Sequence, residues 1–233
     1  MEAERVPTSL KDLFLPPFRQ SLMIAFLLLA GAYVAEHFAN LYEFEYSLRP
    51  TSVYVGDLLL DNLPVINLNG LIVEGALIAI LGGIWFVLSK PRYVLFSLKA
   101  VAILIAVRAF FVSLTHVGIY PGNVDPGLGL LNGIYTYLNF QTGFFFSGHT
   151  ALPFLIAIIF WHNVRARIIL VALTVALAVG VLLAHIHYSI DVFAAPFMAY
   201  GIFKIAQFLF PRDYALIADN TSEVITRPPL LKS

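Results

Sequence analysis

The chain contains no cysteine, and only 12% of its 233 residues are charged. The absence of cysteine excludes disulfides, zinc–thiolate sites and a thiol nucleophile. A soluble domain of this size would carry roughly twice that share of charged side chains. Lysine plus arginine also balance aspartate plus glutamate to a net charge of zero. With neither excess positive charge nor a basic arm, the composition gives no support for nucleic acid as a partner.

Hydrophobic side chains replace the missing charge: they make up 60% of the residues, and the mean hydropathy is +0.85. A helix that spans a bilayer needs about 20 consecutive, mostly apolar residues. Six stretches fit or approach this length, at residues 21–41, 69–88, 94–115, 150–161, 168–185 and 188–210. The fourth stretch is short unless the apolar residues just before it extend it. The sequence therefore predicts an all-α fold, a six-transmembrane-helix bundle.

Three regions follow from this division of the chain. Residues 1–20 mix apolar and basic side chains, as an interfacial segment does, and their prolines exclude one continuous helix. Residues 21–210 form the six-helix transmembrane catalytic domain. Residues 211–233 are polar and contain proline, so we expect a peripheral, partly disordered cytoplasmic tail. The first apolar stretch is too long for a signal peptide and lacks a small-residue cleavage site.

Lysine and arginine are unevenly distributed between the two sides of the predicted bundle. With the N-terminus in the cytoplasm, all of them fall in cytoplasmic segments except Arg49, in the first outer loop, and Arg108, within the third span. Basic residues accumulate in cytoplasmic loops, so we expect this orientation. The even number of spans then places both termini in the cytoplasm. His149, His187 and Asp191 lie at the outer, extracytoplasmic face, although they come from different helices.

The segment AHIHYSIDVFAA, residues 184–195, holds the first candidate catalytic pair. His187 and Asp191 are four residues apart, a spacing that places both on one face of a helical turn. An aspartate held against one ring nitrogen fixes the tautomer of a histidine and makes the other nitrogen a better nucleophile. The alternative is an outer-face turn whose polar side chains lie in the headgroup layer. His185 points elsewhere on a helix, and we treat it as a supporting residue.

The motif FFFSGHT, residues 144–150, places a small polar cluster directly after three phenylalanines. Glycine at a helix start lets the backbone approach an anion, and the first-turn amides then point at it. Ser147 can cap this helix or donate to a ligand, and Gly148 allows the close approach. His149, in the first turn, is placed to give a proton to a leaving group. The alternative is a serine-capped helix with an interfacial histidine. We expect the phenylalanines to line the lip of a cavity or to face lipid.

Arg108 lies inside an apolar stretch, seven residues and about 10 Å of helix before Thr115. The two residues fall on one helix face. A buried arginine requires a carboxylate or phosphate partner, and its fork of donors matches phosphate oxygens. We therefore expect this face to bind a substrate phosphate. The alternatives are snorkelling to the outer interface and a structural ion pair with Glu36 or Glu74.

Four carboxylates near the outer face keep more than one interpretation. Glu36 and Glu74 lie near the outer ends of the first and second spans, where either can pair with Arg108, hold a substrate amine or lie at the interface. Asp57 and Asp61 lie in the first outer loop, where we expect them to be solvated or turn-forming.

SGH followed by HxxxD at opposing helix ends resembles the type 2 phosphatidic acid phosphatase superfamily, which comprises six-helix lipid phosphatases and phosphotransferases. The phosphatases of that superfamily also carry KxxxxxxRP and an arginine six residues before the second histidine. This chain has neither element, and Val181 occupies the position of that arginine.

The sphingomyelin synthase branch of the superfamily, which also lacks those elements, is more similar. It carries FSGHT, found here at residues 146–150, and HxHYTxDV, found at residues 185–192 with Ser189 in place of threonine. Its R-x6-T motif is matched by Arg108 and Thr115.

This resemblance implies a two-step mechanism. His187, oriented by Asp191, would attack the phosphorus of a glycerophospholipid, and His149 would protonate the departing diacylglycerol oxygen. The phospho-head group on the nucleophile would then pass to a lipid alcohol such as ceramide. Arg108 would offset the developing phosphoryl charge. The other candidate substrate-binding residues are Thr115, Ser147, Gly148, Tyr188, Glu36, Glu74 and His185.

The same resemblance sets the expected partners. We expect a membrane phospholipid and a lipid alcohol, ceramide or diacylglycerol, within the lipid bilayer, and no cofactor or metal ion; whether the chain forms a homo-oligomer stays open. The chain departs from the branch at residues 141–143, which read Gln-Thr-Gly where the branch has Cys-Gly-Asp. A carboxylate that holds a head-group amine would therefore have to be Glu36, Glu74 or Asp125.

Three functions are compatible with these motifs. The first is a lipid phosphotransferase of the sphingomyelin synthase type. The second is a hydrolase on the same scaffold, either a lipid phosphate phosphatase or a phospholipase C-like enzyme. The missing phosphatase cations favour a phosphodiester substrate, because a phosphomonoester dianion requires more positive charge. The third is a non-enzymatic lipid-binding or transport protein, although transporters place charged groups at mid-membrane, whereas here they gather at one face.

Overall fold

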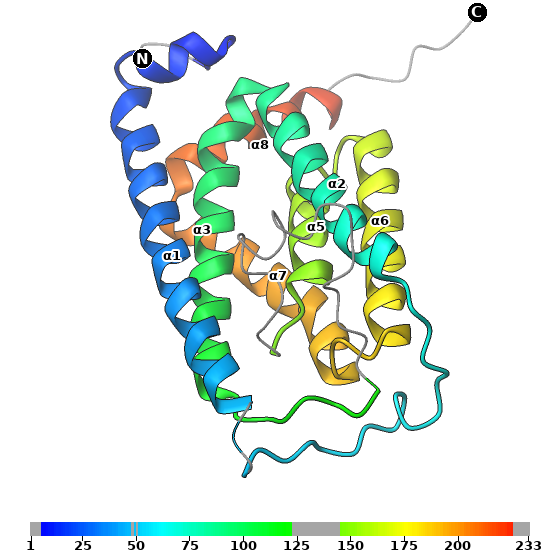
Figure 1. Ribbon diagram of the computed structural model, residues 1–233. Coiled ribbons are helices and arrows are strands. Elements are labelled where there is room, and N and C mark those ends of the chain that lie inside the picture. Colours follow the sequence, from blue (N-terminus) through cyan, green and yellow to red (C-terminus); the bar gives the residue numbers. More distant parts are fainter. Residues whose placement is uncertain (1–5, 48, 50, 123–144, 226–233) are drawn as a thin grey trace, which may run out of the picture.

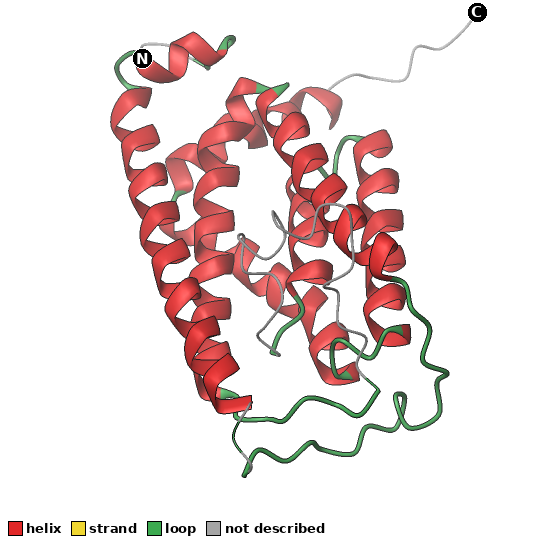
Figure 2. Cartoon of the chain, in the orientation of Figure 1, coloured by secondary structure: helices red, strands yellow, loops and turns green. Residues whose placement is uncertain are grey.

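The computed structural model describes residues 6–47, 49, 51–122 and 145–225, and all the regular secondary structure in these ranges is helical (Figures 1 and 2). The elements are a short 3₁₀ helix η1 (Leu10–Phe14) and the α-helices α1 (Phe18–Ser47), α2 (Asn69–Leu88), α3 (Pro91–Leu114), α5 (Gly148–Ile159), α6 (Val164–Leu183), α7 (Ser189–Leu209) and α8 (Pro211–Ile225). The predicted all-α fold is confirmed for this part of the chain.

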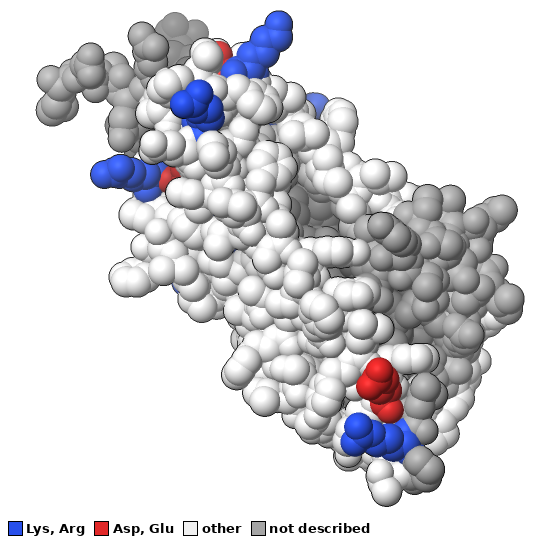
Figure 3. Space-filling view, turned by 60° about the vertical axis from the view of Figure 1, so that its left-hand side comes forward, with Lys and Arg blue, Asp and Glu red and all other residues white. Residues whose placement is uncertain are grey.

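Five of these helices, α1, α2, α3, α6 and α7, are long and apolar enough to cross a membrane. Figure 3 shows charged side chains gathered at the two ends of one face, with a band between them that is almost free of charge among the described residues. Such a band is what a bilayer requires of the surface that it contacts. The structure therefore supports a multi-pass membrane protein.

The fourth predicted span, α5, is shorter than the others. Its twelve residues extend about 18 Å, whereas the hydrocarbon core of a bilayer is about 30 Å thick. Phe145 and Phe146 precede the helix without joining it. Most of α5 is buried, because it packs between α6 and α7. It is an interior helix of the bundle, and the count of six spans stays a prediction.

The helices alternate in direction, so that their connections gather at two ends (Figure 1). One end carries η1, the turns between α2 and α3 and between α5 and α6, and α8; we call it the α8 end. The other carries residues 51–68, 115–122 and 184–188, and we call it the loop end. The starts of α5 and α7 both lie toward the loop end, which brings two distant parts of the sequence together.

The proline-rich segment before α1 behaves as predicted. The 3₁₀ helix η1 stops at Phe14, and α1 begins only after Pro16 and Pro17. Proline has no N–H to donate and a fixed φ, so a continuous helix through this pair is excluded.

The region after α7 differs from our expectation of a partly disordered tail, because Pro211–Ile225 forms α8. Proline suits the first position of a helix, and an acidic residue in the first turn stabilises it. That residue, Asp213, forms a buried ion pair with Lys99 of α3, and both also hydrogen-bond to the Ser21 hydroxyl of α1 at 2.7 Å. Sequence polarity suggested a detached tail, but this ion pair holds α8 on the bundle.

The ion pair makes a stability prediction. Lys99→Met leaves the Asp213 carboxylate buried without its cation, which is expected to lower the free energy of unfolding by about 3–5 kcal/mol. Denaturant unfolding in detergent micelles measures this loss. The double variant Lys99→Met/Asp213→Leu is expected to recover most of it, because two apolar groups need no partner. Lys90→Met, in the α2–α3 turn, is the control, because Lys90 forms no ion pair within the described residues; its expected change is within about 0.5 kcal/mol. A single variant as stable as the control would contradict the assigned role.

Candidate active site

Three chain segments meet at the loop end of the bundle: the start of α5, the turn before α7 and the first turn of α7. The ring centroids of His149 and His187 lie 5.6 Å apart, with the rings nearly perpendicular. The backbone N–H of Ser147 donates to the backbone carbonyl of Asp191 at 3.1 Å, which fastens the two helix starts together. The structure thus brings the three predicted catalytic residues, His149, His187 and Asp191, into one site.

Asp191 lies beside His187, but the two residues do not share one turn of a helix, as their spacing suggested. His187 precedes α7, whose N-cap is Tyr188, and Asp191 is the third residue of the helix. The Asp191 carboxylate turns back over the helix start, where its Oδ2 accepts the Tyr188 N–H at 3.1 Å and lies 3.4 Å from His187 Nδ1. Both side chains are buried. A proton held on Nδ1 by this carboxylate leaves the lone pair of Nε2 available to attack an electrophile.

The SGHT motif forms the start of α5, with Ser147 at the N-cap position. The Ser147 side chain makes no capping hydrogen bond; its oxygen accepts the Thr150 hydroxyl at 3.4 Å. The glycine at position 148 leaves room for Arg108, because a Cβ at this position would lie 3.4 Å from Nε of Arg108. The glycine thus lets a guanidinium approach the first turn of α5. A cation beside a helix N-terminus makes this spot attractive to an anion.

Arg108 is held at this spot by protein groups on two sides. Its Nε donates to the Phe146 carbonyl at 3.1 Å, and its NH1 forms an ion pair with Glu36 of α1. Of the alternatives for its partner, the structure selects Glu36 rather than Glu74. The side chain does not snorkel outward, since Arg108 is only 8% exposed.

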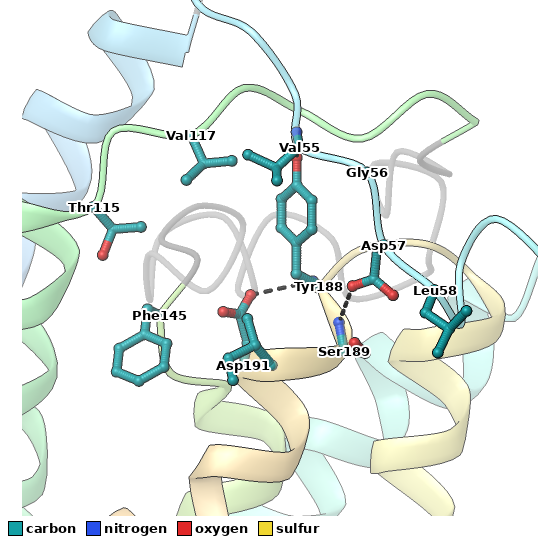
Figure 4. Close-up of a pocket in the computed structure, with 11 residues that line it drawn as sticks. Val55, Gly56, Asp57, Leu58, Thr115, Val117, Phe145, Tyr188, Ser189 and Asp191 are labelled. Carbon is teal, nitrogen blue, oxygen red and sulfur yellow. Dashed lines mark hydrogen bonds between the residues drawn. The ribbon is translucent and has the colours of Figure 1, made fainter.

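A cavity of about 400 Å³ opens beside the site, and Figure 4 shows the residues that line it. Thr115, just after α3, and Asp191 lie on its wall, so the face that carries Arg108 continues to the cavity. Phe145 also lines it, as expected for a cavity lip. Phe146 differs from that expectation: its side chain is fully buried in the hydrophobic core, while its carbonyl accepts a hydrogen bond from Arg108.

Asp57 has a role at the site that the sequence did not predict. We expected it to be solvated or turn-forming; it does form a turn, by accepting the N–H groups of Leu59 and Leu60, but it is 7% exposed. Its Oδ2 accepts the Ser189 N–H at 2.7 Å, so it caps the start of α7 close to Asp191 (Figure 4). Burial acts to raise the pKa of this carboxyl, but the hydrogen bonds that it accepts outweigh burial and hold the pKa below its ordinary value of 3.8.

Tyr188 joins two loops over the site. Its hydroxyl donates to the Gly118 carbonyl at 2.8 Å and accepts the Val55 N–H at 3.2 Å. Burial raises the pKa of this hydroxyl, against the opposing effect of the Val55 bond. Gly118 lies so close to the neighbouring loop that a Cβ there would come within 2.9 Å of the Tyr54 nitrogen. The predicted substrate-binding tyrosine therefore also fixes the loop layer above the cavity.

A second tyrosine–aspartate contact strengthens this layer. Asp61, expected to be solvated or turn-forming, accepts a hydrogen bond from the Tyr120 hydroxyl. That bond raises the pKa of the Tyr120 hydroxyl to about 12.

Two other predicted residues lie outside this constellation. His185 is 3% exposed and packs against Tyr120 at a centroid distance of 5.4 Å, without lining the cavity. Glu74, on α2, has one buried carboxylate oxygen for which the described residues offer no hydrogen-bond partner. Asp125 and residues 141–143 lie outside the described residues. No group of three or more His, Cys, Asp or Glu side chains that could hold a metal ion occurs within the described ranges.

Comparison with known families points to one superfamily. Residues 142–208 match the family model described as PAP2 superfamily C-terminal. The match covers α5, α6 and nearly all of α7. It contains His149, His187 and Asp191, whereas Arg108 and Thr115 precede it. It supports membership of the PAP2 superfamily, whose members are phosphatases and phosphotransferases. Comparisons with curated proteins and with solved structures gave no match.

The position of Asp57 gives a second stability prediction. Asp57→Ala leaves the Ser189 N–H at the start of α7 without its acceptor, which is expected to lower the free energy of unfolding by about 1–3 kcal/mol. The pKa is lowered on folding, so the carboxylate stabilises the protein above its unfolded pKa, and this contribution is lost as the pH falls through the folded pKa. The difference between the wild type and the variant is therefore expected to shrink in acid.

Denaturant unfolding at neutral pH and near pH 3 measures both effects. Asn62→Ala, in the same loop, is the matched control, because the Asn62 side chain is exposed and bonds only to Leu58 within its own turn. A variant of Asp57 that unfolds like this control would contradict the capping role.

Proposed function

We propose that the protein is an integral membrane lipid phosphotransferase. It moves the phospho-head group of a glycerophospholipid to a lipid alcohol such as ceramide and releases diacylglycerol. The observation that carries the proposal is the facing pair of buried histidines: His187 is held by Asp191, and His149 lies in the first turn of α5, beside the Arg108 guanidinium. The PAP2 match and the membrane-spanning helices support a lipid as the substrate class.

In the first step, Nε2 of His187 attacks the phosphorus of the donor lipid. A nitrogen–phosphorus bond forms, the bond from phosphorus to the glycerol oxygen breaks, and protonated His149 gives its proton to that oxygen. Diacylglycerol leaves, and the head group stays on the imidazole as a covalent intermediate. Asp191 keeps Nδ1 protonated and offsets the positive charge that develops on the ring.

In the second step, the two histidines exchange roles. His149, now neutral, accepts the proton of the acceptor hydroxyl, and the acceptor oxygen attacks phosphorus as the bond to His187 breaks. The enzyme returns to its initial protonation state, so atoms and charges balance over the cycle.

Arg108 and the first turn of α5 would stabilise the phosphoryl group in both steps. Negative charge grows on the phosphoryl oxygens, and a fixed cation near a helix N-terminus stabilises it without reorganising in the transition state. The ion pair with Glu36 supports this role, because it holds the guanidinium in place. Thr115, Ser147, Gly148 and Tyr188 would bind the substrate around this point.

We also propose that the loop end faces the extracytoplasmic side, with both chain termini in the cytoplasm. The α8 end carries basic residues, among them the half-buried Lys90 and the exposed Arg165 and Arg212, and basic residues collect on the cytoplasmic side of membrane proteins. The active site would then open to the periplasm or an organelle lumen.

Hydrolysis is the second candidate function, because the PAP2 superfamily includes phosphatases. Water in place of the lipid alcohol in the second step gives this reaction without any change in the protein residues. The two candidates therefore differ only in the acceptor.

A head-group transfer assay tests the function. The purified protein is incubated with head-group-labelled phosphatidylcholine, phosphatidylethanolamine or phosphatidic acid, each with and without ceramide. We expect label on ceramide and an equal amount of diacylglycerol from one of the diesters. If diacylglycerol is released equally with and without ceramide and ceramide stays unlabelled, the protein is a hydrolase and not a transferase. The absence of turnover of any lipid would support a non-enzymatic protein.

A second prediction concerns the Asp191 carboxylate. Asp191→Asn keeps an oxygen that can accept the Tyr188 N–H, so the helix cap and the fold are expected to remain. The charge that supports the imidazolium is removed, and turnover is expected to fall by at least about 100-fold. Head-group release and thermal unfolding are measured on the same preparation. Turnover close to wild type in a folded variant would contradict the role of Asp191.

A further inference from the structure

A second groove lies toward the α8 end of the bundle, away from the candidate active site. It has a volume of about 560 Å³ and lies between α5, α7 and α8. Its walls include Phe154 and Ile158 of α5, Phe197 and Tyr200 of α7, and Tyr214 of α8. Phe197 is 80% exposed, so the groove opens to the outside of the bundle. Apolar and aromatic walls that face outward in a membrane protein are in contact with lipid.

The length of the groove matches one leaflet of a bilayer. Its wall on α7 extends from Pro196 to Gln207, a helical length of about 16 Å. Half of a hydrocarbon core of about 30 Å is close to this value. The groove therefore fits an acyl chain that enters from one face of the membrane and ends near its middle.

Positive charge gathers where the groove reaches the α8 end. Lys204 lines the groove, and its Nζ lies 5.6 Å from the centroid of the Tyr200 ring. His162 and Trp161 line the same region, and the Arg167 guanidinium lies 5.0 Å from the Trp161 ring centroid. No aspartate or glutamate is among the described residues that line the groove, and Lys204 forms no ion pair within the described part of the chain.

We propose that this groove binds one anionic glycerophospholipid, with an acyl chain between α5 and α7 and the phosphate at Lys204. Tryptophan and tyrosine favour the membrane interface, and basic pockets between membrane helices attract anionic head groups. The lipid is distinct from the substrate proposed above, since His149 and His187 lie at the opposite end of these helices.

The two tryptophans of the chain provide the test. In a Trp85→Phe variant, Trp161 in the groove is the remaining fluorophore. This protein is placed in phosphatidylcholine vesicles that contain brominated phosphatidylglycerol or brominated phosphatidylcholine, both of which quench tryptophan on contact. We expect brominated phosphatidylglycerol to quench half of the Trp161 fluorescence at a mole fraction roughly fivefold lower than brominated phosphatidylcholine does. One basic residue near an anionic lipid predicts a preference of this size.

Two matched variants test whether Lys204 causes this preference of the groove for phosphatidylglycerol over phosphatidylcholine. Lys204→Gln is expected to abolish it, whereas Lys90→Gln, also at the α8 end and also beside an aromatic ring, is expected to keep it. In a Trp161→Phe variant, Trp85, which is 65% exposed on α2, is expected to be quenched equally by both lipids.

Three outcomes would overturn the proposal: equal quenching of Trp161 by both lipids, an unchanged preference in Lys204→Gln, or loss of the preference when sodium phosphate is added at constant ionic strength. The last would identify free phosphate rather than lipid as the ligand. His187→Ala is expected to keep the preference, so the result is independent of the proposed catalysis.

Discussion

A single buried guanidinium determines how the loop end of the bundle is assembled. Arg108 lies within an apolar helix, where an unpaired charge would be costly. Glu36 from α1 and the Phe146 carbonyl just before α5 supply its partners. Because His149 follows Phe146 by three residues, the bond that satisfies the charge also sets where α5 begins. The requirement to pair one cation thus links three helices and positions the proposed acid.

Backbone groups transmit this placement to His187, the proposed nucleophile. The Ser147 N–H bonds to the Asp191 carbonyl, so the start of α7 follows the start of α5. From the other side, Asp57 accepts the Ser189 N–H and holds the same helix start against the loop between α1 and α2. His187 lies directly before this doubly fixed turn. The loops at this end are therefore part of the scaffold of the site, and a change in them is expected to reach the histidines.

Features that depend on local composition, or on the alternating direction of successive membrane helices, could be predicted from the sequence. Hydropathy located the membrane helices, the proline pair located the break before α1, and alternation of the spans brought the histidines to one end. The sequence did not predict contacts between segments far apart in the chain. Nothing near Asp57 indicates that its partner is the Ser189 amide, and the two carboxylates that could pair with Arg108 look alike in sequence. Helix α8 was missed because its anchor, Lys99, lies more than a hundred residues earlier.

The central claim is that His187 carries the head group between donor and acceptor. The most direct measurement is a rapid quench in base during turnover of an isotopically labelled phospholipid without acceptor, followed by peptide mass spectrometry. We expect a phospho-head-group mass on the peptide that contains His187, and we expect this mass to be lost when ceramide is added before the quench. The same mass on the His149 peptide, or turnover with no modified histidine, would contradict it.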